Sequence, residues 1–451
     1  MDRAATDGSP TDDRHPRDRL RRELSRGDAT LLVVSSVIGV GIFLTPGTVA
    51  GVLPHPTLFL FAWLAGGALS LAGALANAEL GAMFPHAGGD YVYLREGFHP
   101  IAGFLVGWLS FFVIYAGTVA TLAVGFADAL AAFVPVEAGG RVLVALAVIA
   151  LTSWVNYVGL RAGATFNNAT AIVKVATLIG FAVLGPLIGR GSLANFESAA
   201  PVTPAMLGGL GLALSPVLFS YLGWNASVYV ASEIREPDRN LPASLFIGLG
   251  LCTVLYLAMN GLYLYALSMP ALAGEPRAGE AAARALFGPV GGSIAAGLIL
   301  ASILGCLNAT ILVGPRIAYA MALDGLFFQG SDRVHHANRT PYVAIVSQAA
   351  TAAAIVVVLQ RFPSVLDYTT FAIVLATIAD TAALYALRRR QPKRRRPYRA
   401  WGYPWVPALY LVTNAAIALA MLRGRPLECA IGLAVTATGL PFYAWFAGRR
   451  A

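Results

Sequence analysis

The chain has 451 residues, of which 57% are hydrophobic and only 12% are charged. Soluble globular proteins carry about 25% charged residues, so this composition excludes a soluble enzyme and indicates a protein that crosses a membrane many times. The formal net charge of +9 does not indicate nucleic acid as a partner, because the basic run 388–399 lies between two apolar segments.

Apolar segments long enough to cross a bilayer, which takes about 20 residues, follow one another along the chain. They predict an all-α integral membrane protein with about 12 transmembrane helices. The segments are residues 30–52, 57–83, 101–134, 141–160, 165–189, 205–232, 243–270, 286–322, 341–360, 364–387, 404–422 and 427–447.

Lys and Arg are divided unequally between the two faces of this arrangement. With a cytoplasmic N-terminus, 24 of them fall on the cytoplasmic face and 7 on the opposite face. Positive loops stay in the cytoplasm, so we expect both termini there and the protein in the inner membrane of the cell. The excess positive charge would then face anionic lipids.

Residues 1–29 are rich in Asp, Arg, Pro and Ser and lack the apolar core of a signal peptide. They predict a disordered cytoplasmic tail, whose end at residues 20–24 can lie on the membrane surface. The cysteines Cys252, Cys306 and Cys429 all fall in apolar segments, so no disulfide framework is expected. The histidines show no ligand-like spacing, and neither a metal nor a cofactor is expected.

Two segments carry glycine and small polar residues where a simple anchor would have leucine. The first is residues 35–43, around Gly39 and Gly41, and the second is residues 219–225, around Gly223. A helix interrupted at membrane depth frees backbone groups that protein, water or a ligand must satisfy. Paired interruptions in two halves of a chain are typical of a transporter's binding site. Close helix packing through small residues is the alternative for the first break.

Each break suits one end of an amino acid. A helix that restarts after Gly41 directs its free N–H groups and the positive end of its dipole at the gap, which suits a carboxylate. Unwound carbonyls near Gly223 can accept hydrogen bonds from an ammonium. Aromatic residues there are more often core than gate, and only the position beside Gly223 favours Phe219 as a gate.

Lys174 lies well inside the fifth segment, on one helical face with Asn167, Thr170 and Thr177. Such a lysine is costly unless it faces a polar interior, which makes it a functional candidate. Burial disfavours its charged form and would let it exchange a proton near neutral pH. The alternative is a structural tether that donates to backbone carbonyls.

The joint after the second segment, residues 84–96, combines a proline, a Gly-Gly pair and charges of both signs. We expect it to lie in the membrane interface and to close an inner path. Glu79 is expected to pair with Arg95 or another basic residue, or else to be solvated. Asp380, in the tenth segment, can pair with residues 388–390.

Taken together, these stretches resemble the amino acid–polyamine–organocation (APC) transporters, and among them the bacterial amino acid permeases similar to L-type exchangers. The resemblance extends from the first segment to the tenth and into the basic loop. The matching stretches are residues 37–43, 78–96, 156–159, 219–225, 233–242, 316–325, 396–399 and 402–404.

The resemblance implies a leucine-transporter-type fold and alternating access. Two inverted repeats of five helices, residues 30–189 and 205–387, would be followed by a basic cytoplasmic loop, residues 388–403. Two extra transmembrane helices would occupy residues 404–447.

The resemblance also implies where the substrate binds. The carboxylate would meet backbone N–H groups at residues 39–41, and the amine would meet carbonyls at Val37 and in the second break. Phe219 would act as a gate. The substrate-binding residues expected on this basis are Val37, Gly39, Val40, Gly41, Phe219, Ser220, Leu222 and Asn225.

Lys174 matches the family's lysine that replaces a sodium ion of sodium-coupled relatives and is a proposed proton-coupling site. Two differences from the family's pattern limit which of its site contacts and partners can be expected in this chain. Val40 stands where a Ser or Thr is often found, so only the backbone contact to the carboxylate remains. No cysteine lies near residues 135–140, so no disulfide-linked heavy chain is expected.

The predicted function is secondary active transport of L-amino acids by proton symport, with amino acid exchange without proton coupling as the alternative. The first, third, sixth and eighth segments carry no mid-segment carboxylate, which favours neutral substrates. A membrane sensor that has lost transport is a remote alternative. The segments show no cluster of residues typical of an enzyme's active site, so enzymatic activity is not expected.

Overall fold

The computed structural model describes residues 18–130, 133–134, 137–197, 201–359, 362–424 and 426–449. Over these residues the protein is helical and contains no β-sheet. Ten of the described helices are long and apolar enough to cross a membrane, and two shorter apolar helices, Met206–Tyr221 and Tyr342–Val358, accompany them. The prediction of an all-α membrane protein is confirmed.

The first half of the chain contains both long helices and short pieces, because its first and third segments are irregular. The first segment is divided into three helices. The third contains a π-helical turn, η1, in which one extra residue widens the turn. The elements are α1 (Arg26–Val37), α2 (Gly41–Leu44), α3 (Pro46–Val52), α4 (Pro56–Met83), α5 (Asp90–Gly97), α6 (Pro100–Leu109), η1 (Ser110–Tyr115), α7 (Ala116–Leu130), α8 (Ala138–Val158) and α9 (Leu160–Ile188).

The second half repeats this mixture, and its sixth segment is again broken. The long α14 bends at Gly288, whose φ of 74° lies in the left-handed region that glycine tolerates. The elements are η2 (Leu193–Phe196), α10 (Pro204–Tyr221), α11 (Ala226–Tyr229), η3 (Ala231–Glu233), α12 (Pro237–Ala266), α13 (Met269–Leu272), α14 (Ala278–Val313), α15 (Pro315–Leu323), α16 (Tyr342–Leu359), α17 (Phe362–Arg390), α18 (Trp405–Gly424) and α19 (Pro426–Gly448).

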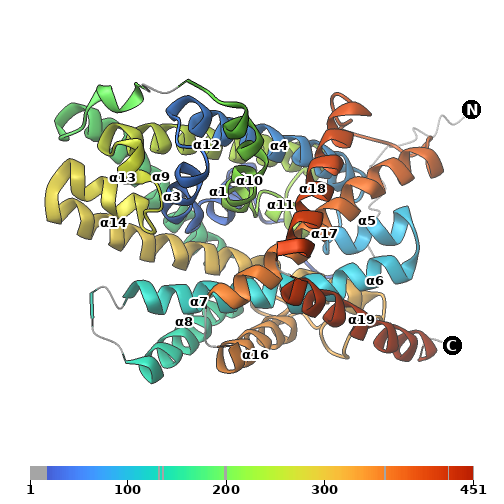
Figure 1. Cartoon of the computed structure of the whole chain (residues 1–451). Helices are drawn as coiled ribbons and strands as arrows, with labels where there is room; N and C mark the ends of the chain where they lie inside the picture. Colours follow the sequence, from blue (N-terminus) through green and yellow to red (C-terminus); the bar gives the residue numbers. More distant parts are fainter. Residues whose placement is uncertain are drawn as a thin grey trace, which may run out of the picture.

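The long helices run roughly side by side across Figure 1, and the two broken segments lie in the middle of the bundle. Helix α5 and the C-terminal end of α19 lie on the right of the picture, on the side that we call the N-side. Helices α3 and α13 lie toward the opposite side. Helix α1 packs against α9, α12 and α14, so the first break is surrounded by helices from both halves of the chain.

The end of the predicted tail packs against the N-side. Residues 1–17 of that tail lie outside the described part. Leu20 and Leu24 are buried. Leu24 exchanges backbone hydrogen bonds with the segment after α11, donating to Glu233 and accepting from Arg235 at 2.9 Å each. This short pairing fixes the entry of the chain into α1.

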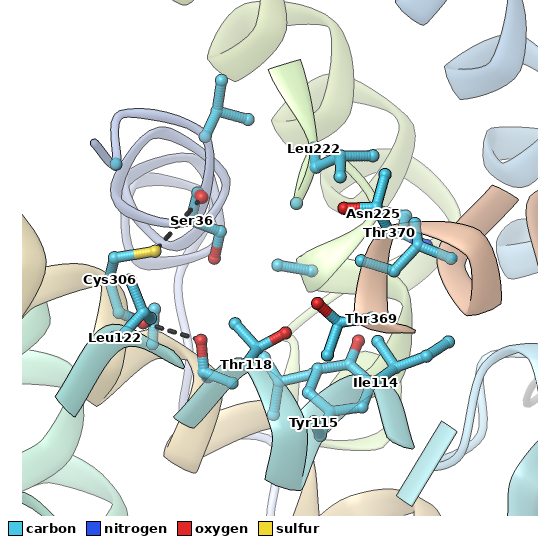
Figure 2. A pocket seen from close by; sticks show the side chains of 18 of the residues that line it. Ser36, Ile114, Tyr115, Thr118, Leu122, Leu222, Asn225, Cys306, Thr369 and Thr370 are labelled. Atoms are coloured by element: carbon cyan, nitrogen blue, oxygen red, sulfur yellow. Dashed lines mark hydrogen bonds between the residues drawn. The ribbon is translucent and has the colours of Figure 1, made fainter. Parts of the chain in front are cut away.

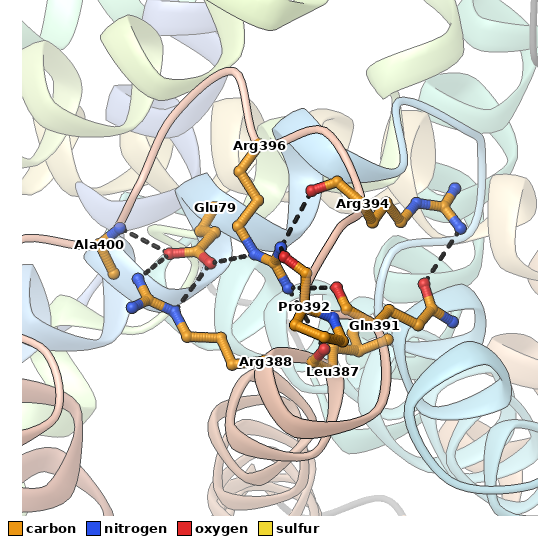
Figure 3. A network of polar contacts seen from close by, with 8 residues as sticks. All are labelled: Glu79, Leu387, Arg388, Gln391, Pro392, Arg394, Arg396 and Ala400. Atoms are coloured by element: carbon orange, nitrogen blue, oxygen red, sulfur yellow. Dashed lines mark hydrogen bonds and ion pairs between the residues drawn. The ribbon is translucent and has the colours of Figure 1, made fainter.

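A buried carboxylate joins α4 to the end of α17 and the loop after it (Figure 3). Glu79 is 0% exposed and accepts hydrogen bonds from the Arg388 guanidinium at 2.6 and 3.0 Å. Arg396 Nε and the Ala400 backbone N–H donate to it at 3.1 and 2.7 Å. Four donors therefore compensate the cost of burying this charge. Glu79 does not pair with Arg95 and is not solvated.

The predicted pairing of Asp380 with residues 388–390 is wrong in the described part of the chain. Arg388 binds Glu79, and Arg390 donates to the backbone carbonyls of Gly97 and Phe98 at 2.8 and 2.9 Å. Neither carboxylate oxygen of Asp380 accepts a hydrogen bond from a described donor.

We expect Glu79→Gln to lower the thermal stability of the purified protein in detergent. A neutral amide leaves the Arg396 guanidinium, whose side chain is 6% exposed, without its counter-charge, and breaking a buried ion pair costs about 3–5 kcal/mol. The measurement is the unfolding temperature, followed by thiol-reactive fluorescence and by size-exclusion chromatography after heating.

The matched control is Asp238→Asn, because Asp238 forms an exposed pair with Arg395 at 3.2 Å and exposed pairs contribute at most about 1 kcal/mol. Equal unfolding temperatures for the two variants would contradict the stabilising role of Glu79.

Candidate functional site

The first break lies between α1 and α2. Helix α1 ends at Val37, Ile38 leaves the helical conformation, and α2 begins at Gly41. Gly41 has no room for a side chain, because a Cβ there would lie 2.7 Å from Ser220 Cα in the second broken segment. Glycine at this position therefore permits the close approach of the two breaks.

Lys174 of α9 reaches the carbonyls that the first break frees. Its side chain is fully buried, and Nζ donates to Ser35 O at 3.0 Å and to Ile38 O at 2.9 Å. The ammonium therefore stabilises the unwound backbone. This is the tether geometry considered from the sequence, and its proton-coupling role stays a prediction.

Helix α14 supplies further donors to the first break. Ser302 Oγ donates to Ile38 O at 3.0 Å, and Cys306 Sγ donates to Ser36 O at 3.5 Å. Both residues lie on one face of α14, one helical turn apart. The small side chains of this face allow α14 to approach the broken backbone closely.

The second break lies between α10 and α11. Helix α10 ends at Tyr221, Leu222 is extended, and α11 begins at Ala226. Gly223 has a φ of 96°, and a Cβ there would lie 2.8 Å from Ser36 O. The turn and the contact with the first break both require glycine at this position.

Tyr256 of α12 lies between the two breaks. Its hydroxyl is within 2.8 Å of Val37 O and 2.9 Å of Ser220 O. Both carbonyls are among those expected to receive the substrate amine. Tyr256 could not be predicted from the sequence, since a single tyrosine in an apolar helix carries no distinctive signal.

A cavity lies between the breaks and comprises about 1040 Å³ of space that no atom fills. All eight residues expected to bind substrate line it: Val37, Gly39, Val40, Gly41, Phe219, Ser220, Leu222 and Asn225.

The rest of the cavity wall is rich in hydroxyl groups, as Figure 2 shows for Tyr115, Thr118 and Thr369 around the open space. These side chains come from η1, α7 and α17, the third and tenth segments. The π-helical turn η1 places Ile114 and Tyr115 at the wall, and no sequence signal for this turn was recognised. The threonines of the wall are Thr118, Thr121, Thr310, Thr369, Thr370 and Thr377.

One carboxylate also reaches this cavity. Asp90, the first residue of α5, lines it and accepts a hydrogen bond from the Tyr229 hydroxyl at 2.6 Å. Asp90 enters from the joint after the second segment, outside the first, third, sixth and eighth segments, whose lack of a mid-segment carboxylate is the basis for expecting a neutral substrate.

The main cavity shares parts of its wall with two neighbouring cavities. Phe219 also lines a smaller cavity beside Trp224 and Tyr410. Val40 also lines a cavity that contains Asp128 and Glu280 and comprises about 620 Å³. Phe219, Leu222, Thr370 and Thr377 line both the main cavity and the smaller one, and Val40 lines both the main cavity and the one near Asp128.

Ion pairs join the elements on the N-side of the main cavity. Arg95 pairs with Asp324 after α15, and the Tyr91 hydroxyl donates to the same carboxylate. Arg316 binds Glu233 through two hydrogen bonds of 2.9 and 3.0 Å, and both side chains are at most 1% exposed. The joint of residues 84–96 is thus part of a polar closure on this side.

The chain was compared with known proteins. A serine/threonine exchanger, SteT, of Bacillus subtilis is 29% identical over 96% of this chain and 98% of its own length. The human Asc-type amino acid transporter 1 is 28% identical over 94% of this chain and 82% of its own length. The human large neutral amino acids transporter small subunit 2 is 28% identical over 94% of this chain and 80% of its own length.

These relatives are transporters, and the chain is accordingly a multi-pass membrane protein that transports amino acids and is not an enzyme. The family model for amino acid permeases matches residues 24–437, nearly the whole length of the chain. The protein therefore belongs to the amino acid permease family of APC transporters.

Proposed function

We propose that the protein carries neutral L-amino acids across the inner membrane by alternating access. The observation that supports this most strongly is the meeting of the two helix breaks across one cavity. The N-side is assigned to the cytoplasm, because the chain's excess of Lys and Arg falls on that side. The basic loop of residues 388–403 would then lie near anionic lipids.

In this proposal the two breaks bind the two charged ends of the substrate. The N–H groups at Gly39, Val40 and Gly41 receive the carboxylate, at the positive end of the restarting helix. The amine is bound by carbonyls of Val37 and of residues 219, 220 and 222, with Asn225 beside them. Phe219 closes over the bound substrate as a gate, since it lies between two cavities.

The hydroxyl-rich wall favours a small neutral or hydroxylated side chain. Thr118 and Thr369 face the space beyond the two breaks, and threonine hydroxyls both donate and accept hydrogen bonds. The relatives whose names mention serine and threonine or neutral amino acids support this substrate class. Asp90 does not by itself favour a cationic substrate, because Tyr229 already binds one of its oxygens.

The proposed mode of coupling is proton symport through Lys174. Its ammonium binds two carbonyls of the first break, so loss of the proton would weaken a contact that stabilises the break. Substrate binding and proton binding would then act on the same backbone. Exchange without proton coupling is the second candidate, and the exchange activity in the name of the Bacillus subtilis relative favours it.

Uptake into proteoliposomes tests the binding scheme. L-Serine, L-alanine and L-leucine should compete with labelled L-serine, whereas ethanolamine and 3-hydroxypropionate, which lack one charged end, should compete at least tenfold more weakly. Each charged end makes hydrogen bonds worth about 1.5–3 kcal/mol. Equal competition by the truncated analogues would overturn the scheme, and strong competition by L-lysine would exclude neutral selectivity.

Lys174→Ala separates the two modes of coupling. An inward proton gradient should drive accumulation of labelled L-serine into empty vesicles for the wild type, and the variant should lose this drive while serine–serine counterflow persists. Wild-type uptake that requires internal amino acid and ignores the gradient would establish exchange instead.

We expect Gly41→Ala to lower L-serine uptake at least tenfold. The added methyl group would lie 2.7 Å from Ser220 Cα and would force apart the two backbones that form the binding site. Gly180→Ala in α9 is the matched control, because a Cβ there meets no atom within 4 Å. Uptake by both variants at the wild-type rate would show that the two breaks need not be in contact.

A further inference from the structure

Two buried carboxyl groups lie together beside the substrate cavity, although their residues are far apart in the sequence. Asp90 begins α5 and Asp380 lies in the middle of α17, and they are 1% and 0% exposed. Helix α5 packs against α17, and the two carboxyl groups lie within hydrogen-bonding reach of each other. Asp90 Oδ1 and both oxygens of Asp380 accept no hydrogen bond from another described donor.

No cation compensates this pair among the described residues. The groups that act on the ionisation of either carboxyl, besides the two themselves, are Tyr229 and Asn77 and the backbone of Asp90, and none is Lys, Arg or His. Burial raises the pKa of Asp90. The titratable side chains whose ionisation the two carboxylates influence are the phenols Tyr93 on α5, Tyr115 on η1, Tyr229 on α11 and Tyr410 on α18.

Two adjacent carboxylates in an apolar environment cannot both remain ionised, since each disfavours the charge of the other. The pair is therefore stable with one proton between the two groups. A metal cation would need several oxygen ligands around it, whereas the cavity reaches Asp90 but not Asp380. A proton needs no such space.

Hydrogen bonds connect this pair to the second break. Asn225 Nδ2, at the edge of the break, donates to Tyr229 Oη at 3.1 Å, and Tyr229 Oη donates to Asp90 Oδ2 at 2.6 Å. The next residue along α5, Tyr91, binds Asp324 in the closure on the N-side. The pair thus lies between the substrate cavity and that closure.

We propose that Asp90 and Asp380 share one proton and form a second proton-binding site, distinct from Lys174, that is loaded from the substrate cavity. The proton passes from water in the cavity to Asp90 Oδ1 and is held between the two carboxyl groups. When it leaves, both groups are ionised and repel each other. This repulsion moves α5 away from α17 and weakens the contacts of Tyr91 and Arg95 with Asp324.

The protonation of the pair is independent of transport and is tested directly by pH-difference infrared spectroscopy of the reconstituted protein. The wild type should show the C=O stretching band of a protonated carboxylic acid at neutral pH, and the band should disappear as the pH rises. Asp380→Asn should remove it, because the new amide donates to Asp90 and replaces the proton. Asp90→Asn should do the same and serves if the first variant does not fold.

Two controls define the assignment. Asp238→Asn changes an exposed, ion-paired carboxylate and should leave the band unchanged. Lys174→Ala should also leave it unchanged if the two proton sites are separate. A band of wild-type intensity in both Asp380→Asn and Asp90→Asn, or the loss of the band in Lys174→Ala, would overturn the proposal.

The coupling role of the pair rests on the proposed transport function and has its own experiment. Proton-driven accumulation of labelled L-serine should fall at least tenfold in Asp380→Asn, while counterflow, measured at several pH values, should persist and lose its pH dependence. The coupling role would be overturned if Asp380→Asn accumulated L-serine as the wild type does. It would also be overturned if accumulation by the wild type required sodium. If the wild type carries no neutral amino acid, the transport proposal fails, and the infrared band still decides whether the pair holds a proton.

Discussion

The structure depends on one constraint, the satisfaction of the carbonyl groups that the break after α1 leaves free inside the membrane. An unpaired polar group in such an environment costs several kcal/mol. Three helices that are distant in sequence each provide donors to it: Lys174 from α9, Tyr256 from α12, and Ser302 and Cys306 from α14. The break therefore determines which helices surround α1, and these helices hold the binding cavity open at its centre.

Charge is distributed in a way that suits this arrangement. Around the cavity the polar groups are mostly hydroxyls and backbone groups, which add no net charge to its wall. The buried ion pairs Glu79–Arg388 and Glu233–Arg316 lie on the N-side, where they join segments that are far apart in the chain. Asp90 and Asp380 are the exception, since they are buried carboxyl groups close to the cavity with no described cation beside them.

The sequence predicts those features whose physical cause is local. Glycine at positions 39, 41 and 223 marks the breaks. At Gly41 and Gly223 a Cβ would lie within 2.8 Å of the other broken segment, and at Gly223 the backbone is also in the left-handed region. Lys174 is recognisable because a lysine inside an apolar helix requires a polar partner. The apolar segments themselves predict the all-α fold, and the ordered motifs indicate the permease family.

The features that the sequence did not reveal depend on contacts between distant residues. Glu79 receives its donors from residues more than 300 positions later, and no local pattern distinguishes these arginines from their neighbours. Asp90 and Asp380 belong to different helices, so their proximity follows only from the fold. The π-helical turn at Ser110–Tyr115 arises where helix packing stabilises an extra residue, and its apolar sequence resembles that of an ordinary helix.

The Tyr256 hydroxyl is shared between the two broken segments. A phenol has one proton to donate, yet its oxygen lies within hydrogen-bond distance of the carbonyls of both Val37 and Ser220. Val37 O also accepts a hydrogen bond from the Gly39 N–H at 2.8 Å, and the phenol proton can alternate between the two carbonyls at little cost. One hydroxyl therefore links the backbone of the two broken segments at the point where they meet, and in the binding scheme proposed above the ammonium group of the substrate would share the same two carbonyls with it.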